Sequence, residues 1–188
     1  MKIPIEISAR HVHLCPRDVE KLFGRGKRLT SQTPISQTGQ FLSRERVTLR
    51  TTNSEFANVG IVGPERRETQ VELAATDARR LGVAAPVRES GHLTGTPGIT
   101  ITGPKGSVKI THGVILSKRH IHASKKDAKR HGLRHGQLVS VSIKGERAVT
   151  FHNVIVRVHE SFHWRLHLDT DEANAAGLTG NEKGDVIV

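Results

Sequence analysis

The chain has 188 residues, enough for one large domain or for two small domains that each bury a core. Aromatic residues make up only 3 % of it, so any core must be built from Val, Ile, Leu and Ala, and the scarcity of stacking side chains counts against single-stranded nucleic acid as a partner. The formal net charge of +11 at pH 7 favours anionic partners, including small molecules that carry phosphate.

Several protein classes are excluded by what the chain lacks. No apolar run approaches the roughly 20 residues of a membrane-spanning helix. The first residues, MKIPIEISAR, have no apolar block of the kind found in a signal peptide. The single cysteine, Cys15, excludes an intrachain disulfide and a cysteine-rich zinc site. We therefore expect a soluble cytoplasmic protein that has no membrane partner.

The predicted elements, in chain order, are mostly short strands. IPIEIS alternates isoleucine with other residues and predicts a half-buried strand. A helix follows, with Pro16 at its start and Gly24 at its end, and a later helix runs from Ser124 to Gly132. Further strands are predicted for RVTLRT, for both halves of GTPGITITGPKGSVKIT, and for LVSVSI, AVTF and NVIVRV, with IKGER as a hairpin turn. Short antiparallel strands with few helices predict small barrels or sandwiches.

The sequence contains an internal repeat. SARHVH at 8–13 matches SKRHIH at 117–122, an offset of 109 positions. FANV at 56–59 matches FHNV at 151–154, and this second offset of 95 positions continues through VELAATDARRLG and LHLDTDEANAAG. Two matches in the same order indicate a duplication, in which the first copy has fourteen extra residues in its middle.

Each copy carries a pair of histidines at positions i and i+2. Residues at this spacing in a strand point to the same face, with Cα atoms about 6.6 Å apart. His11 and His13 could therefore bind one metal ion, and His120 and His122 another. Two imidazoles suit zinc and its neighbours in the first transition row, but at least a third ligand is needed.

The repeat supplies a third ligand at one equivalent position in each copy. Glu72 in QVELA corresponds to His167 in RLHLD, and both lie within apolar strands, where an unpartnered ionisable group would be costly. Asp169 is an alternative ligand, because it would share the face of His167. Three protein ligands leave one coordination position open, as in catalytic zinc sites. The predicted ligand sets are His11, His13 and Glu72, and His120, His122 and His167.

Two arginines and the single cysteine are further candidates for functional residues. Arg66 and Arg67 precede Glu72 by a few residues, and an arginine beside a metal ion would share an anion such as phosphate with it. An ordinary surface arginine is the alternative for each. Cys15 occupies the helix-cap position that Ser124 fills in the second copy, so we expect a substitute cap there and no nucleophile.

The ordered set RHVHL, GP.R..TQVEL...DAR.LG, PVRESG, PGITI.GPKGSV, KRHIH and LH.DTDEANAAG resembles the PduL-type phosphotransacylases, also called phosphate propanoyltransferases, over nearly the whole chain. The resemblance implies a mainly β fold with short helices and two small β-barrel domains from an internal duplication. The first strand would be exchanged into the C-terminal barrel, so the domains would comprise 10–117, and 1–9 plus 118–188.

The resemblance also implies an activity and its site. The enzymes of this family transfer a short acyl group, propanoyl or acetyl, between coenzyme A and phosphate, with acyl phosphate as a product. The two predicted ligand sets would hold two Zn²⁺ per chain, although other divalent first-row metals fit the same ligands. Arg66 would grip phosphate, and Ser8 and Asn174 match positions near coenzyme A. The resemblance further suggests a homodimer.

Two alternatives from other functional classes stay open on the residues alone. The same ligands suit a dinuclear-metal hydrolase of thioesters or phosphoesters, which would not depend on free phosphate. A basic nucleic-acid-binding protein with structural metals is the other, and the open metal positions count against it. Family members packaged in bacterial microcompartments carry an N-terminal extension; this chain begins at its first strand, so we expect a free cytoplasmic enzyme.

Overall fold

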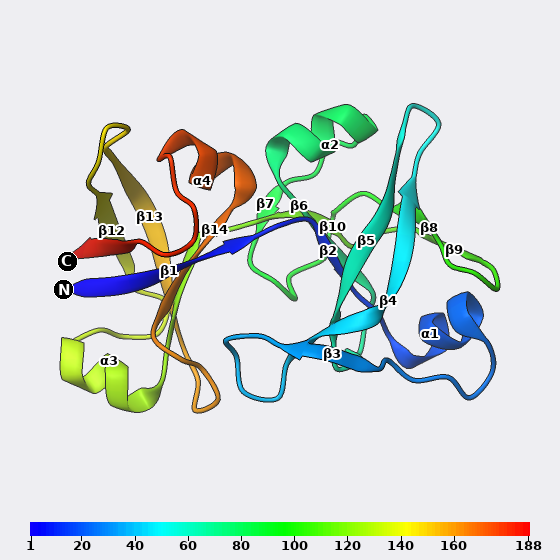
Figure 1. The fold of residues 1–188 in the computed structure, drawn as a ribbon, viewed down its shortest axis with the longest axis horizontal. Coiled ribbons are helices and arrows are strands. Elements are labelled where there is room, and N and C mark those ends of the chain that lie inside the picture. The colour runs from blue at the N-terminus through cyan, green and yellow to red at the C-terminus, as the bar shows by residue number, and fades with distance from the viewer. The chain divides into compact units, whose positions relative to one another are not determined.

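The computed structural model describes residues 1–188 and consists mainly of β-strands with four short helices, as predicted (Figure 1). The chain divides into two compact units, which we describe separately. The C-terminal unit contains Met1–Ala9 and Lys118–Val188, and the N-terminal unit contains Arg10–Ser117. None of the four helices has the length and apolar character needed to cross a bilayer.

The C-terminal unit is a closed barrel of six strands. In barrel order these are β1 (Lys2–Ser8), β14 (Arg165–Asp169), β11 (His120–Ala123), β13 (Val149–Val158), β12 (Leu138–Ile143) and β15 (Lys183–Ile187). Strand β1 runs parallel to β14 and antiparallel to β15, which confirms that the first strand of the chain belongs to the C-terminal barrel. Its alternating residues Ile3 and Ile5 are buried in the barrel, as the period of two predicts.

The N-terminal unit is built on a nine-stranded, barrel-like sheet whose strand path stays open. Along the sheet lie β7 (Val87–Arg88), β10 (Val114–Ser117), β6 (Gln70–Leu73), β2 (His11–His13), β5 (Glu55–Gly63), β4 (Phe41–Arg50), β8 (Ile99–Thr102) and β9 (Ser107–Ile110), and β3 (Ser31–Pro34) pairs with β4. The two-barrel expectation is therefore met by one closed barrel and one open sheet.

The duplication is visible in the strand order. In the N-terminal unit β2 lies between antiparallel β6 and parallel β5; in the C-terminal unit β11 lies between antiparallel β14 and parallel β13. The strand that precedes each histidine pair joins the other unit: β1 precedes β2 but pairs with β14, and β10 precedes β11 but pairs with β6. The exchange is thus reciprocal; the sequence-based expectation named the transfer of β1, and its bounds of 10–117 also put β10 in the first domain.

The four helices are α1 (Pro16–Phe23), α2 (Ala75–Leu81), α3 (Lys125–His131) and α4 (Thr170–Ala175). The predicted starts and ends of α1 and α3 are confirmed. Ser124 and Asp127 form a reciprocal capping box at α3, whereas Cys15 occupies the N-cap position of α1 without a side-chain cap bond. At the start of α1 the Thr69 hydroxyl binds the N-cap backbone instead. It accepts from Cys15 N at 3.0 Å and donates to Asp18 Oδ2 at 2.6 Å.

Two equivalent asparagines within long strands have a left-handed backbone conformation. Asn58 in β5 and Asn153 in β13 have φ of 56° and 57°, in the left-handed region that asparagine tolerates better than most residues. The sequence predicted two strands, AVTF and NVIVRV, where the structure has the single strand β13. One asparagine in this conformation interrupts the sequence pattern without ending the strand.

Each unit has its own apolar core, and the two histidine strands line the edge of these cores. Val12 and Ile121, the middle residues of the two His-x-His segments, are completely buried. Because side chains alternate in a strand, the flanking histidines of each segment must face away from the core residue between them. The fold thereby gathers the imidazoles on one face of each sheet.

Candidate metal centres

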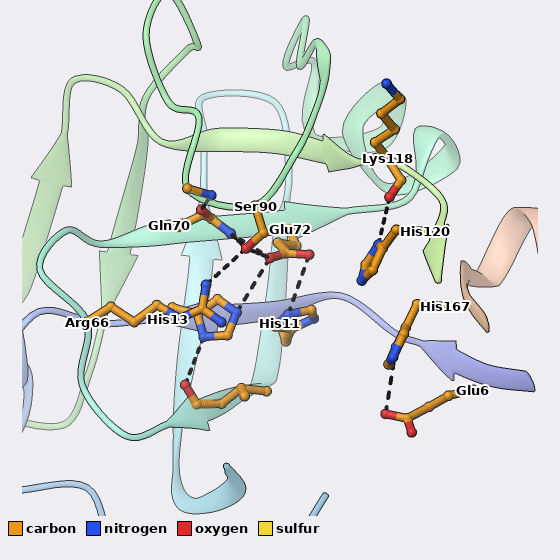
Figure 2. A network of polar contacts seen from close by, with 12 residues as sticks. Glu6, His11, His13, Arg66, Gln70, Glu72, Ser90, Lys118, His120 and His167 are labelled. Atoms are coloured by element: carbon orange, nitrogen blue, oxygen red, sulfur yellow. Dashed lines mark hydrogen bonds and ion pairs between the residues drawn. The ribbon is translucent and has the colours of Figure 1, made fainter. Parts of the chain in front are cut away.

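The first predicted ligand set lies within the N-terminal unit. His11 of β2 is the direct cross-strand partner of Glu72 of β6, and His13 lies two residues further along the same strand. His11 Nε2 is 3.7 Å from Glu72 Oε2, and His13 Nε2 is 3.5 Å from Glu72 Oε1. Figure 2 shows the carboxylate of Glu72 facing both imidazoles. The antiparallel register, rather than any loop, brings these three side chains together.

Burial and neighbouring charge set the protonation states of His13 and Glu72. Burial lowers the pKa of His13 to about 4, so this imidazole is neutral at pH 7. Burial by itself raises the pKa of Glu72, but the adjoining His11 holds that pKa well below its usual value. Glu72 is therefore a carboxylate, and a buried carboxylate needs a cationic partner.

The arrangement fits a metal ion. His13 Nδ1 lies 3.0 Å from the carbonyl oxygen of Val62, which can only accept, so the ring proton sits on Nδ1. The lone pair of Nε2 then faces the Glu72 carboxylate, an electrostatically poor arrangement unless a cation lies between them. Two ligands of a tetrahedral zinc ion are about 3.4 Å apart, close to the distances found here. Fixing the tautomer through the second ring nitrogen is typical of metal-bound histidine.

The second predicted ligand set lies within the C-terminal unit. His120 of β11 is the direct cross-strand partner of His167 of β14, the same register as His11 and Glu72. The ring centroids of His120, His122 and His167 lie 4.5–4.8 Å apart, and one nitrogen of each ring lies within 4.8 Å of the others. Three imidazoles at this spacing match the three-histidine sites that hold zinc with one open position.

The groups behind these histidines differ from those in the first set. His120 Nδ1 lies 2.8 Å from the carbonyl oxygen of Lys118, which again leaves Nε2 as the ligand atom. His167 Nδ1 is 3.9 Å from Glu6 Oε1 on β1, the cross-strand partner of His167 (Figure 2). The equivalent partner of Glu72 is the buried Ile115. A carboxylate thus stands in the ligand set of one unit and behind the ligand set of the other.

The predicted phosphate-binding Arg66 is connected to the first ligand set. Its Nη1 donates to Ser90 Oγ at 2.9 Å, and Ser90 Oγ donates to Glu72 Oε1 at 2.8 Å (Figure 2). Gln70 donates to both Ser90 and Glu72. The neighbouring Arg67 is exposed, so the structure separates the two arginines that the sequence left equivalent. A guanidinium held next to a metal ligand is suited to bind an anion there.

Sequence reasoning missed Ser90 and Gln70. Gln70 lies two residues before Glu72 and so shares its face of β6, a signal that the period of two offered. Ser90 lies just after β7 in the PVRESG segment, and the backbone amide of its neighbour Gly91 donates to Gln70 Oε1 at 2.8 Å. Nothing local in that segment predicted that it packs against Glu72, because the contact spans 18 residues.

The remaining predicted residues belong to the C-terminal unit. Ser8 ends β1, half-buried and paired with Asp169 of β14, and Asn174 is exposed on α4. Asp169, the alternative ligand, is used otherwise: its side chain caps α4 by accepting from Glu172 N at 2.8 Å. Burial raises the pKa of Asp169. The ligand set of the C-terminal unit therefore keeps His167.

Comparison with known proteins finds one family over nearly the whole chain. A family model described as phosphate propanoyltransferase matches residues 4–179. The phosphate propanoyltransferase of Thermotoga maritima is 47 % identical over 186 residues, covering 98 % of this chain and 87 % of that protein. Those of Enterococcus faecalis and Listeria monocytogenes are 45 % identical over 183 residues and 43 % identical over 185 residues. They cover 97 % and 98 % of this chain and 87 % of each relative.

Proposed function

This chain belongs to the phosphate propanoyltransferase family, and from that premise we propose that it transfers a propanoyl group between coenzyme A and phosphate with two zinc ions, one per unit. Its class of activity is that of a phosphate acyltransferase. The observation that carries the metal proposal is the pair of three-residue ligand sets, which occupy the same register in two copies of one fold.

The chain's own residues would divide between metal binding and substrate binding. His11, His13 and Glu72 would hold one ion, and the three histidines of the C-terminal unit the other. When bound, zinc supplies a Lewis acid that stabilises the negative charge developing on the thioester carbonyl or on the departing thiolate. His11 keeps a side-chain exposure of 16 %, against 3 % for His13, so substrate would approach from the side of His11.

Arg66 would bind and orient phosphate. Phosphate is an anion at neutral pH, so the attack on a thioester needs positioning more than it needs a general base. The planar guanidinium matches two phosphate oxygens at once, and Ser90 links it to Glu72 so that the anion would lie beside the metal ligands. Ser8 and Asn174 would contact coenzyme A. The excess positive charge of the chain would draw coenzyme A and phosphate toward the protein.

The test follows thiol release from propanoyl-CoA with and without phosphate, before and after removal of metal. Release that requires both phosphate and metal, with about two zinc ions per chain, is the expected result. Metal-dependent release without phosphate would instead identify a thioester hydrolase. Comparing acetyl-CoA, propanoyl-CoA and butanoyl-CoA by kcat/KM tests the propanoyl assignment, which is wrong if either other substrate is preferred.

A matched pair of variants tests the role of Arg66. Arg66→Met should raise the KM for phosphate by about 10–100-fold, because a charge-assisted contact of roughly 1.5–3 kcal/mol is lost. Its neighbour Arg67 is exposed, and Arg67→Met should leave the KM for phosphate unchanged. An equal effect of the two substitutions would show a general charge effect and no specific phosphate contact.

A further inference from the structure

The arginine that precedes each histidine pair makes the same contacts in both units. In the N-terminal unit Arg10 Nη2 is 3.1 Å from Asp77 Oδ1, and its guanidinium lies 4.3 Å from the ring centroid of Phe56. The repeat offsets predict the counterparts of these residues in the second copy.

Those counterparts are in contact as well. In the C-terminal unit Arg119 Nε is 2.7 Å from Glu172 Oε1, and its guanidinium lies 5.2 Å from the ring centroid of Phe151. Each group combines an ion pair with a cation–π contact. We call each group an arginine clamp; its members are Arg10, Phe56 and Asp77 in one unit, and Arg119, Phe151 and Glu172 in the other.

Each clamp connects the two chain segments that carry one ligand set. Arg10 is bonded directly to His11, and Asp77 lies in the first turn of α2, five residues after Glu72. The same relation holds in the C-terminal unit, where the acidic member of the clamp lies five residues after His167, in the first turn of α4. The ion pair therefore joins the start of the histidine strand to the helix that follows the third ligand.

The histidine strands need such an anchor. β2 has only three residues, His11–His13, and short strand ends open locally at little cost in free energy. Arg10 lies at the bend just before β2, and its guanidinium covers the ring of Phe56, a member of the N-terminal core. Because Asp77 is buried, its charge also requires this partner.

We propose that the two arginine clamps are positioning devices, each of which holds the ligands of its own unit's metal site at binding distance. The proposal deepens the proposed function and rests on its two metal sites. The proposal predicts a local effect. Loss of one clamp weakens metal binding in the same unit and leaves the other unit's site intact. A general contribution to folding would have no such preference.

The experiment uses the full chain with one ligand set disabled at a time. His122→Ala leaves only the N-terminal site, and His13→Ala leaves only the C-terminal site. Into each background Arg10→Met or Arg119→Met is introduced, and zinc affinity is measured by competition with a chelator. Arg10→Met should weaken zinc binding by about 10–100-fold in the His122→Ala background, the usual cost of losing a group behind a metal ligand, and by less than twofold in the other. Arg119→Met should show the opposite preference.

A matched control is available on the same helix. Arg80, in the last turn of α2, also stacks on Phe56, at 4.7 Å, but it adjoins no histidine. Arg80→Met should leave both zinc affinities unchanged. Because Arg10→Met leaves Asp77 buried without its partner, the double variant Arg10→Met/Asp77→Asn repeats the test without an unpaired charge. Equal losses in both backgrounds, or none in either, would overturn the proposal.

Hydrogen exchange in the metal-free chain separates this inference from the metal sites themselves. Arg10→Met should speed amide exchange at residues 11–13 and leave residues 120–123 unchanged, and Arg119→Met should do the reverse. If the wild-type chain binds no zinc, the proposed metal sites fail, and the exchange pattern still decides whether each clamp orders its own strand. If each substitution changes exchange equally at residues 11–13 and 120–123, or at neither, the proposed role of the clamps is wrong.

Discussion

The two ligand sets share one geometry but differ in chemistry. His11 faces Glu72 across β2 and β6, and His120 faces His167 across β11 and β14, in the same antiparallel register. Backbone pairing therefore places the third ligand, whichever residue occupies that position. The ligand itself is a carboxylate in one unit and an imidazole in the other.

The difference shows where each unit keeps its negative charge. In the N-terminal unit the charge belongs to Glu72, in the ligand set. In the C-terminal unit the three proposed ligands are imidazoles, which bind metal in their neutral form, and Glu6 lies behind His167. The duplicated fold thus preserves the positions of the proposed ligands while the carboxylate lies within one set and behind the other, a difference that would change how strongly each site holds a cation.

The largest effect is expected when one proposed ligand is removed from either set. His13→Ala and His122→Ala should each lower phosphate-dependent activity by more than about 100-fold, beyond the 10–100-fold typical of groups behind a ligand. Zinc content should fall by one ion per chain in each case, measured by metal analysis of the purified protein. Full activity in either variant would show that the site of that unit does not serve the reaction.

The position of the carboxylate can be tested directly. Glu72→Gln removes a charged ligand and should weaken zinc binding at the N-terminal site by at least about 100-fold. Glu6→Gln changes only the group behind His167 and should weaken the other site by about tenfold, near the lower end of such effects. Chelator competition measures both. Equal losses would show that the two carboxylates act alike.

Substitutions at the two helix N-caps should have smaller effects, which concern stability. Ser124 makes a side-chain cap bond at α3, whereas Cys15 makes none at α1. Ser124→Ala should lower the free energy of unfolding by about 1 kcal/mol, and Cys15→Ala should change it by less than about 0.5 kcal/mol. Urea denaturation of the two variants measures the difference. A loss of about 1 kcal/mol in Cys15→Ala would show that the thiol caps the helix after all.

The smallest effect concerns an exposed turn before β15 where the two copies diverge. Glu182 accepts hydrogen bonds from the Thr179 hydroxyl and from the amides of Thr179 and Gly180, which lower its pKa to about 2. The equivalent position in the first copy is Val87. The stabilisation is present above the ordinary glutamate pKa near 4.5 and is lost as the pH falls toward 2.

Melting temperatures measured over a series of pH values test this loss of stabilisation at low pH. Glu182→Gln should melt slightly below wild type at pH 7, and the gap should close as the pH falls from about 4.5 to about 2. Glu55, whose pairing with Arg50 is also exposed, serves as a control at which Glu55→Gln should change little. A gap that stays constant over this range would assign the effect to a cause other than the carboxylate.

Much of this fold was predictable because its signals are local. The period of two identified β1 and β12, and the Gly-Pro-Lys-Gly turn identified the β8–β9 hairpin. Pro16, Ser124 and two glycines marked the ends of α1 and α3. The repeat then aligned the two histidine pairs and their third ligands. The merging of two predicted strands into β13 was missed, because Asn153 interrupts the sequence pattern, whereas the strand continues through its left-handed conformation.

By itself, the sequence determined which side chains could be ligands and that they occur as two equivalent sets, since residue identity and spacing in a strand suffice for that. The tertiary structure alone decided that β10 joins β6, that Ser90 reaches from Arg66 to Glu72, and that Glu6 stands behind His167. It also decided that Arg10 and Arg119 meet the acidic residues of α2 and α4. These contacts join residues far apart in the chain, and their energies depend on which strands pair across the sheet, a choice that no local pattern encodes.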